Sequence, residues 1–527
     1  ILRNLDYKIF IKIYLEGDLS KDLQHLQSEV ISLLTSFKVI AGDKFDYEFI
    51  NPDKESDDIQ KLYMQIKKAG ILSRNIQSKE GFKVSQSIIF PGAVIYYKDQ
   101  TKAVNFLEYS NSNFVDNQEI NTSIENLEYK FISAIYRVIQ IANNKREKIA
   151  FLNGNGELSE KELFDLTNSN DDENLEYHYD IEFFDIKSFK IDTSNKNGGD
   201  ATISIIDYMA NNFKAIIIAK PTIPFNPLEK FIIDQYLMKG GRIIWFIDMV
   251  LADLDSLMRK PSFIAYKNEL NLDDMFNHYG VNLGSNLIED LKSTSIIINS
   301  NKTNRENYFT WPYYLLIKSN NNHLIVNNIG NVHAKFVSSV DTFYSKFNKK
   351  TILLNSSKNS RVNPTPAKIS FQIAIKPPPI PSFNKVNIPI GVLIEGKFIS
   401  FFKDFLRDKS KSLTKSKETK MIFFADGDIP RNRVVNEGKT WSPLGYDEFS
   451  KKIYSGNKNI VMNSIHYLCD DIKLFHLKEK QRLLATIDKQ KILKYRTLIQ
   501  VINIIFPIIL VLIFHYLFRL YKYKKYS

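Results

Sequence analysis

A glycine-rich turn is the first place in this sequence where the backbone could hold a ligand. The turn follows the apolar stretch 148–152, which has the character of a buried strand. Ligands of parallel α/β sheets bind beyond the carboxyl ends of strands, and a glycine-rich turn can offer backbone N–H groups to an anion. A tight strand-to-helix turn explains the same residues without a ligand. The candidate ligand-binding residues are Asn153, Gly154, Asn155, Gly156 and Glu157.

Three aspartates follow apolar strands further along the chain. Asp248 comes after RIIWFI, and Asp426 and Asp428 lie in the turn ADGD after MIFF. Carboxylates at strand ends can hold a metal ion or act as general acid and base. The alternative is structural, because Asp–Gly is a common turn and aspartate caps helices. These aspartates are candidate ligand-binding residues, and no catalytic residue or metal site is assigned.

Motifs of better-defined chemistry are absent from the sequence. It contains no GxGxxG, GxxxxGK[ST], GxSxG or HExxH pattern, so neither nucleotide binding nor hydrolysis is supported. His466 and Cys469 would share a helix face, but that face is apolar, where a cysteine is usually a small core residue. A single cysteine also excludes an intrachain disulfide and a multi-thiolate zinc site. We therefore expect no cofactor.

The net charge of +12 is concentrated at one end of the 527-residue chain. Residues 471–527 carry 12 Lys and Arg against 3 Asp and Glu, so the remaining 470 residues are nearly neutral. A nucleic-acid partner is therefore not expected. The composition, 44% hydrophobic and 25% charged, is that of a folded protein with enough chain for several domains.

The same end contains the uncharged stretch 501–518, VINIIFPIILVLIFHYLF. A helix of this length spans about 27 Å, close to the thickness of a bilayer core. A buried helix, or two strands separated at Pro507, is the alternative. We predict a basic juxtamembrane helix at 471–497, a transmembrane helix at 498–520 and a basic tail at 521–527. Its polar residues Asn503 and His515 are candidate contacts with a partner helix.

The first 115 residues alternate between strand and helix signals. Apolar periodicity predicts strands at 8–15, 45–50, 86–90 and 93–97, with helices near 20–37 and 57–68. This βαβαββ order is typical of a thioredoxin-like domain. Because the region has no cysteine, thioredoxin redox chemistry is excluded, and a docking or scaffold role is favoured.

The rest of the body predicts a larger α/β domain at 147–470, joined through a helical linker at 116–146. Continuous apolar strands separated by amphipathic helices favour a parallel, doubly wound sheet covered on both faces. A helix is predicted at 227–238, where Gly240 and Gly241 end it, and another at 459–469. The predicted strands are 148–152, 215–219, 242–247, 351–354, 389–394 and 420–425.

Several segments, taken in order, resemble the GldG-type auxiliary components of gliding-motility ABC transporters from Bacteroidetes-type bacteria. The resemblance covers nearly the whole chain, including the apolar C-terminal stretch and its basic tail. The segments that carry it are IYLEGDL (13–19), YEFINP (47–52), IIFPGAVIYY (88–97), NLEYKF (126–131), KIAFLNGNGEL (148–158), AIIIAKP (215–221), FIIDQYLMKGGRIIWFID (231–248), IPIGVLIEGKF (388–398), MIFFADGD (421–428), PLGYD (443–447) and IHYLCDD (465–471).

This resemblance implies a non-enzymatic, membrane-anchored subunit of the bacterial inner membrane with its main body in the periplasm. Its partners would be the permease subunit GldF, the cytoplasmic ATPase subunit GldA and the lipid bilayer. The larger domain would be distantly similar to class I glutamine amidotransferases. Family members often have GHGE where this chain has GNGE, so Asn155 replaces the histidine.

Two other functions remain open on the sequence. One is a membrane-tethered amidotransferase-like or hydrolytic enzyme that uses Asp248, Asp426 or Glu157. The other is a sugar- or peptide-binding receptor, which would need a pocket with aromatic walls.

Overall fold

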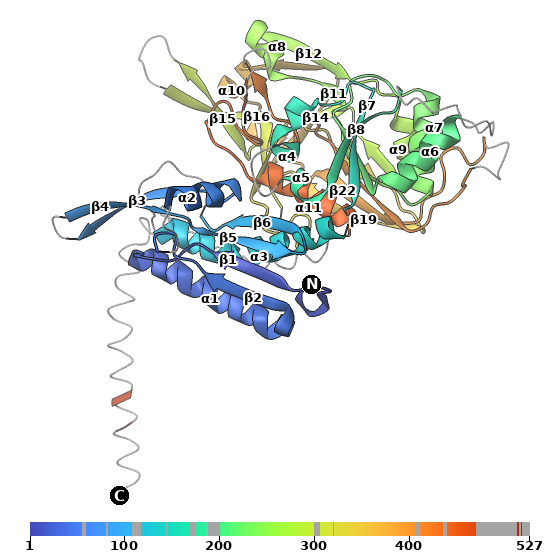
Figure 1. The fold of residues 1–527 in the computed structure, drawn as a ribbon. Coiled ribbons are helices and arrows are strands. Elements are labelled where there is room, and N and C mark those ends of the chain that lie inside the picture. The colour runs from blue at the N-terminus through green and yellow to red at the C-terminus, as the bar shows by residue number, and fades with distance from the viewer. Residues whose placement is uncertain are drawn as a thin grey trace, which may run out of the picture. The chain divides into compact units, whose positions relative to one another are not determined.

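The structure is a computed structural model. The chain divides into two compact units, Ile1–Lys480 and Gln481–Ser527. Figure 1 shows the elements of the first unit, to which the following description refers. The structure describes residues 1–54, 59–80, 83–107, 117–143, 146–168, 174–187, 201–299, 306–319, 321–405, 412–435, 440–470, 514–515 and 518.

A four-stranded sheet organises the N-terminal part, in the order β2-β1-β5-β6. β1 is parallel to β2 and antiparallel to β5, and β5 is antiparallel to β6. A hairpin of β3 and β4, of which β3 was not predicted, is inserted before β5. The elements are β1 (Ile9–Ile13), α1 (Lys21–Ala41), β2 (Phe45–Phe49), α2 (Ile59–Lys68), β3 (Arg74–Glu80), β4 (Lys83–Ile89), β5 (Gly92–Tyr97) and β6 (Gln100–Asn105).

Helix α3 (Asn117–Ala142) packs on this N-terminal sheet. Its side chains Ile120, Leu127 and Phe131 belong to the same buried cluster as Ile11 of β1 and Ile95 of β5. Their spacing of seven and four residues puts them on one helix face, which is the face that a sheet can cover. The segment 116–146 was predicted as a helical linker, and its helix belongs to the N-terminal core.

A seven-stranded sheet forms the centre of the larger part, in the order β19-β22-β23-β10-β9-β7-β8. β8, β7, β9, β10 and β23 are parallel, whereas β22 is antiparallel to both of its neighbours. The fold is thus mixed α/β with a parallel sheet. Its strands are β7 (Lys148–Asn153), β8 (Asp180–Asp185), β9 (Ala215–Ala219), β10 (Arg242–Phe246), β19 (Asn348–Asn355), β22 (Pro389–Gly396) and β23 (Thr419–Phe424).

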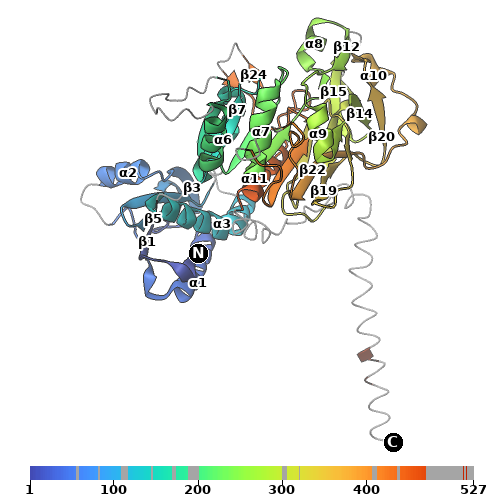
Figure 2. The same ribbon diagram turned by 90° about the vertical axis from the view of Figure 1, so that its right-hand side faces the viewer.

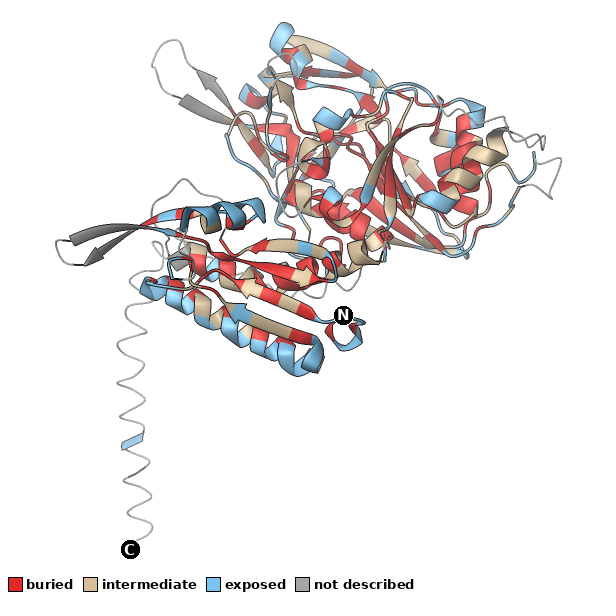
Figure 3. Ribbon diagram, in the orientation of Figure 1, coloured by how far each residue is buried: buried red, intermediate tan, exposed pale blue. Residues whose placement is uncertain are grey.

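Both faces of this sheet are buried, as Figure 3 shows along the central strands. Ile244 and Phe246 of β10 join one apolar cluster, and Ile243 and Trp245 join the other. This alternation explains why the central strands are continuously apolar rather than half polar. Figure 2 shows the helices of this part from a second direction. They are α4 (Phe164–Thr167), α5 (Leu175–His178), α6 (Ala201–Asn212), α7 (Pro227–Met238), α8 (Leu254–Arg259), α9 (Asp273–Tyr279), α10 (Gln372–Ile375) and α11 (Gly456–Leu468).

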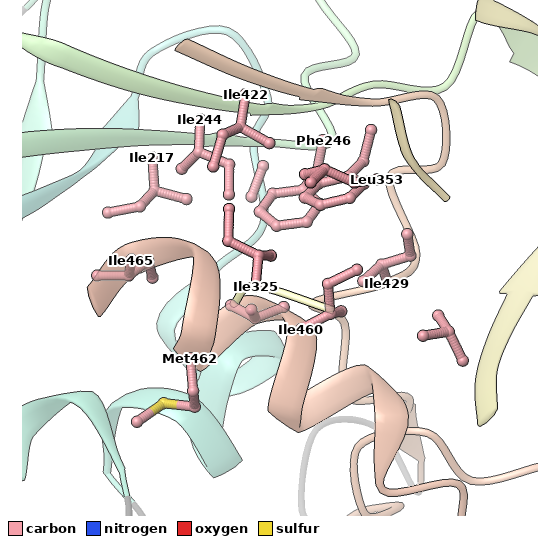
Figure 4. Close-up of a cluster of buried hydrophobic side chains, with 14 of the residues drawn as sticks. Ile217, Ile244, Phe246, Ile325, Leu353, Ile422, Ile429, Ile460, Met462 and Ile465 are labelled. Atoms are coloured by element: carbon pink, nitrogen blue, oxygen red, sulfur yellow. The ribbon is translucent and has the colours of Figure 1, made fainter. Parts of the chain in front are cut away.

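Helix α11 covers the centre of one face. Figure 4 shows Ile460 and Ile465 of α11 facing Ile217, Ile244 and Ile422 of three neighbouring strands. All five side chains have no exposed surface, so each contributes fully to the burial of apolar area.

Short antiparallel strands between β10 and β22 were not predicted from the sequence. They form small sheets, β11-β12-β21, β13-β18, β14-β20 and β15-β16-β17, with a third buried cluster around Trp311. A last pair, β24-β25, follows β23. The strands are β11 (Val250–Leu251), β12 (Ser262–Lys267), β13 (Val281–Leu283), β14 (Asn286–Asp290), β15 (Ser293–Asn299), β16 (Glu306–Lys318), β17 (Asn331–Lys335), β18 (Val340–Thr342), β20 (Ser360–Pro364), β21 (Ala367–Ser370), β24 (Val434–Val435) and β25 (Thr440–Trp441).

The predicted juxtamembrane helix, transmembrane helix and basic tail fall almost entirely outside the described residues. Within the part of the chain that is described, no helix combines the length and the apolar character that crossing a bilayer requires.

Replacing Ile217 by alanine tests the packing of α11 on the sheet. Ile217 is fully buried, so Ile217→Ala should lower the free energy of unfolding by about 2–5 kcal/mol through lost burial and a residual cavity. Urea unfolding of the full chain in mild detergent measures this, because all three tryptophans lie in the larger part. The control is Ile264→Ala at a 52% exposed position, and equal losses for both variants would contradict the packing described.

Candidate functional site

A buried lysine lies between two of the predicted aspartates. Lys220 directly follows β9, Asp248 follows β10, and Asp428 follows β23, so neighbouring strands bring all three to the carboxyl edge of the sheet. Lys220 Nζ lies 2.7 Å from Asp248 Oδ2 and 2.6 Å from Asp428 Oδ1. The three side chains are only 12–14% exposed, so water screens these pairs weakly.

Asp426 stabilises the ADGD turn through hydrogen bonds to backbone N–H groups. Its carboxylate oxygens accept hydrogen bonds from the backbone N–H of Asp428 at 2.7 Å and of Lys335 at 2.8 Å, which fastens the turn to β17. Between the aspartates, the N–H of Gly427 donates to Asp248 Oδ1 at 2.5 Å. A Cβ at Gly427 would lie 2.7 Å from Lys220 Cγ, so the turn needs glycine for this close approach.

More charged groups surround this centre in pairs. Arg431 contacts Asp428 at 3.3 Å and Glu162 at 3.0 Å. Further out, Glu448 Oε1 forms ion pairs with Lys335 Nζ at 2.9 Å and with the Arg433 guanidinium at 3.3 Å. The carboxyl edge therefore carries a network in which each of these cations has a carboxylate partner of the same chain.

The network sets the protonation of its acids. Burial acts to raise the pKa of Asp428, but the charges of Lys220 and Arg431 outweigh it and hold the pKa below its usual value. For Asp248, burial is the stronger effect and raises the pKa in spite of Lys220. Burial also raises the pKa of Asp426 well above normal, helped by the two neighbouring aspartates. Asp428 is therefore the main counter-charge of Lys220.

The polar groups of the glycine-rich turn after β7 form hydrogen bonds with other residues of the same chain. Asn155 is fully buried, and its Nδ2 donates to Glu229 Oε2 at 3.0 Å, while its carbonyl accepts from the N–H of Thr222 at 2.8 Å. Glu229 in turn forms the capping box of α7 with Asn226. The turn needs glycine because Gly156 has φ +71° and a Cβ there would meet Thr222 Oγ1. This geometry is that of a tight strand-to-helix turn.

Glu157 is the titratable group of this turn. Its Oε2 accepts from the N–H of Asn155 at 2.7 Å, and within the described chain its buried Oε1 has no hydrogen-bond partner. Burial raises the pKa of Glu157 to about 7, more than its hydrogen bonds lower it. Glu157 therefore changes charge near neutral pH.

A small polar cavity of about 20 Å³, partly open to solvent, lies beside the lysine network. His333, Lys335, Asp428, Arg431 and Arg433 line it. His333 is buried, and among the residues described neither of its ring nitrogens has a hydrogen-bond partner. Burial and the charge of Lys335 lower its pKa well below normal, so the imidazole is neutral.

The structure thus divides the predicted site residues into two groups. Asp248, Asp426 and Asp428 come together, whereas Asn153, Gly154, Asn155, Gly156 and Glu157 form a separate turn bound to residues 222–229. Sequence reasoning missed Lys220 and Arg431. The position of Lys220 directly after the strand AIIIA was a usable signal, because that position lies at the edge where Asp248 was sought.

Two predictions are left without a structural test. Asn503 lies outside the described residues, and His515 is described only as an exposed helical residue. No group of three or more His, Cys, Asp or Glu in the described ranges is placed to hold a metal ion.

A family model for an ABC-type uncharacterized transport system, that of its auxiliary component, matches residues 146–464, which is more than half of the chain. The chain belongs to this ABC-transporter auxiliary family. The matched range of this auxiliary protein begins just before β7 and ends within α11, so it includes the whole seven-stranded sheet and the lysine network. Residues 1–96 match a domain of unknown function, DUF7088.

The other comparisons add little to the family assignment. No curated protein matches the auxiliary protein. A solved structure named mmIFT52 N-terminal domain is similar with 12% sequence identity and a TM-score of 0.34, covering 61% of this chain and 97% of that chain.

Replacing Lys220 tests whether the network stabilises the auxiliary protein. Lys220→Met leaves two buried carboxylates without their shared cation, and it should cost about 3–5 kcal/mol of unfolding free energy. The triple variant with Asp248→Asn and Asp428→Asn should recover part of that loss in urea unfolding. Lys417→Met, at an exposed position, is the control. If Lys220→Met were as stable as this control, the ion pairs would contribute nothing.

The pKa of Glu157 predicts a pH dependence of stability. Because this pKa is raised from 4.5 to about 7, the protonated form of Glu157 contributes to the free energy of unfolding. This contribution is present in full below pH 4.5 and is lost as the pH rises through 7. Glu157→Gln removes this titration, so between pH 5 and 8 the wild type should lose about 2 kcal/mol more than the variant. Urea unfolding across this range measures the difference. The control is Glu160→Gln at an exposed position, whose stability should depend on pH as that of the wild type does. The same pH dependence for Glu157→Gln and the wild type would contradict the effect of burial.

Proposed function

We propose that this chain is a GldG-type auxiliary subunit, acting without enzymatic activity in an ABC transporter of gliding motility. It works with the permease subunit GldF and the ATPase subunit GldA. The observation that carries the proposal is the match to the ABC-transporter auxiliary family over residues 146–464. The ordered segments shared with GldG-type proteins, such as MIFFADGD at 421–428, extend this family assignment to motility.

The chemistry of the carboxyl edge supports a non-enzymatic role. Asp248 accepts from Lys220 Nζ and from the N–H of Gly427, and Asp428 is held by Lys220 and Arg431. A general base must be free to reach a substrate proton, and these carboxylates are occupied and nearly buried. ATP is then hydrolysed by the partner ATPase, in line with the absence of a nucleotide-binding motif from this sequence.

The N-terminal part serves as a docking domain in this proposal. Its strand order β2-β1-β5-β6, followed by α3 packed on the sheet, supports a thioredoxin-like fold. It lacks the cysteines on which thioredoxin chemistry depends, so it offers surfaces rather than a reactive thiol.

The proposed location is the bacterial inner membrane, with the body of the protein in the periplasm. The support is the uncharged stretch 501–518 followed by Arg519, Lys522, Lys524 and Lys525, a pattern typical of a spanning helix with a cytoplasmic basic end. Asn503 and His515 would then face a permease helix, because polar groups inside a bilayer seek protein partners.

Co-purification from membranes tests this function. The tagged full chain, produced in cells that contain the candidate permease and ATPase subunits, should bring both along after detergent extraction. Asn503→Leu combined with His515→Leu should reduce recovery of the permease several-fold, because the polar contacts between helices are lost. Immunoblots of the eluted subunits measure this recovery.

The matched control is Val511→Leu, an apolar exchange in the same stretch, which should leave recovery unchanged. A chain found outside the envelope fraction, or one purified without either transporter subunit, would contradict the proposal. So would an amidase or hydrolase activity of the wild type that Asp248→Ala abolishes.

A further inference from the structure

Exposed aromatic rings and lysines gather at the amino-terminal edge of the seven-stranded sheet, opposite to the lysine network. They stand on the loop that leads into β19, near the end of β22 and the start of β23. We call this feature the aromatic–lysine surface, and its residues are Phe343, Tyr344, Lys346, Phe347 and Lys415.

Backbone hydrogen bonds fix three segments of this edge side by side. The N–H of Lys397 donates to the carbonyl of Phe347 at 3.0 Å, which joins the loop before β19 to the end of β22. Ile399 forms a bridge with Lys415, and the N–H of Ser400 donates to the carbonyl of Thr414 at 3.0 Å. The surface is therefore held by the folded backbone, although its residues are far apart in sequence.

The aromatic side chains of this surface are unusually open to solvent. Tyr344 is 94% exposed, Phe343 is 50% exposed and Phe347 is 40% exposed. Single exposed apolar residues are common, but three large exposed rings within five residues are a cluster of the kind that marks a contact site. Phe405, on the turn after β22, is 76% exposed as well.

Positive charge surrounds these rings. Lys415 Nζ lies 4.8 Å and Lys346 Nζ 5.2 Å from the centre of the Phe347 ring, where the ring face attracts a cation. In the described chain, neither ammonium group forms an ion pair with a carboxylate. The segments 341–350, 397–405 and 412–418 contain seven lysines and three acidic residues.

From this combination we infer that the aromatic–lysine surface lies against the anionic headgroups of a lipid bilayer. Tyrosine and lysine have an apolar body and a polar tip, so they place the body among acyl chains and the tip among headgroups. The ammonium groups of Lys346 and Lys415 match the negative potential of phospholipid phosphates. The inference rests on the proposed membrane location of the chain.

A bilayer suits this surface better than a folded protein partner does. A ring as open as that of Tyr344 projects from the body, and a fluid headgroup layer takes up such a ring without a preformed pocket. An acidic protein partner would have to match the shape of these projecting rings, because the core of a protein interface is packed as densely as a protein interior.

A tryptophan at position 344 tests the inference in the full chain reconstituted into liposomes. Tyr344→Trp should emit at shorter wavelength, and lipids brominated in the upper acyl chain should quench it, when the liposomes contain phosphatidylglycerol. Liposomes of phosphatidylcholine alone should quench it at least two-fold less. The unsubstituted chain supplies the background from Trp245, Trp311 and Trp441.

The matched control is Tyr266→Trp, because Tyr266 of β12 is also exposed, at 57%, but lies outside the aromatic–lysine surface. It should remain accessible to aqueous iodide and show no bromine quenching. Combining Lys346→Gln and Lys415→Gln with Tyr344→Trp should reduce quenching in the anionic liposomes.

Two outcomes would overturn the inference while leaving the membrane location intact. One is a Tyr344→Trp chain that stays with the liposomes while its introduced indole remains accessible to iodide and is not quenched by bromine. The other is an introduced indole that becomes shielded only when the permease is added, which would assign the surface to a protein partner. A chain that does not stay with the liposomes at all would instead refute the proposed membrane location and, with it, the inference.

Discussion

The shared pairing of Lys220 with Asp248 and Asp428 is the constraint on which the carboxyl edge of the larger sheet depends. These residues follow β9, β10 and β23, so their contacts fix where three neighbouring strands end relative to one another. Burying such charged groups costs desolvation free energy, and their mutual attraction offsets this loss only while every partner is present. The apolar clusters on both faces hold the strands close enough for these short contacts.

This constraint also explains what the edge can do. In a parallel α/β sheet the carboxyl edge is the usual place for a ligand, and here two of its carboxylates serve the ion pairs while Asp426 fastens the ADGD turn. The glycine-rich turn after β7 is closed by Asn155 and Glu229 in the same manner. The opposite edge of the sheet differs, because Tyr344 and the nearby Phe343 and Phe347 rings are exposed there beside lysines.

The sequence predicted the buried strands better than the antiparallel parts. Continuous apolar runs such as AIIIA and RIIWFI correspond to β9 and β10, and Pro227–Met238 is a helix at the predicted bounds. Strands such as β16 (Glu306–Lys318) were missed although residues 311–315 are buried, because Pro312 interrupts the apolar run and a proline inside a run argues against a central strand. Lys220 was missed because its partners come from distant loops, and a lone lysine after a strand looks like a solvated residue.

The charges at the carboxyl edge satisfy one another, since Lys220 pairs with both Asp248 and Asp428. A double-mutant cycle between Lys220 and Asp428 measures this most directly, from the unfolding free energies of the wild type, Lys220→Met, Asp428→Asn and the double variant. Our account expects a coupling energy of about 2 kcal/mol or more, in the range found for contacting charged residues. Independent, additive losses from the two substitutions would contradict it.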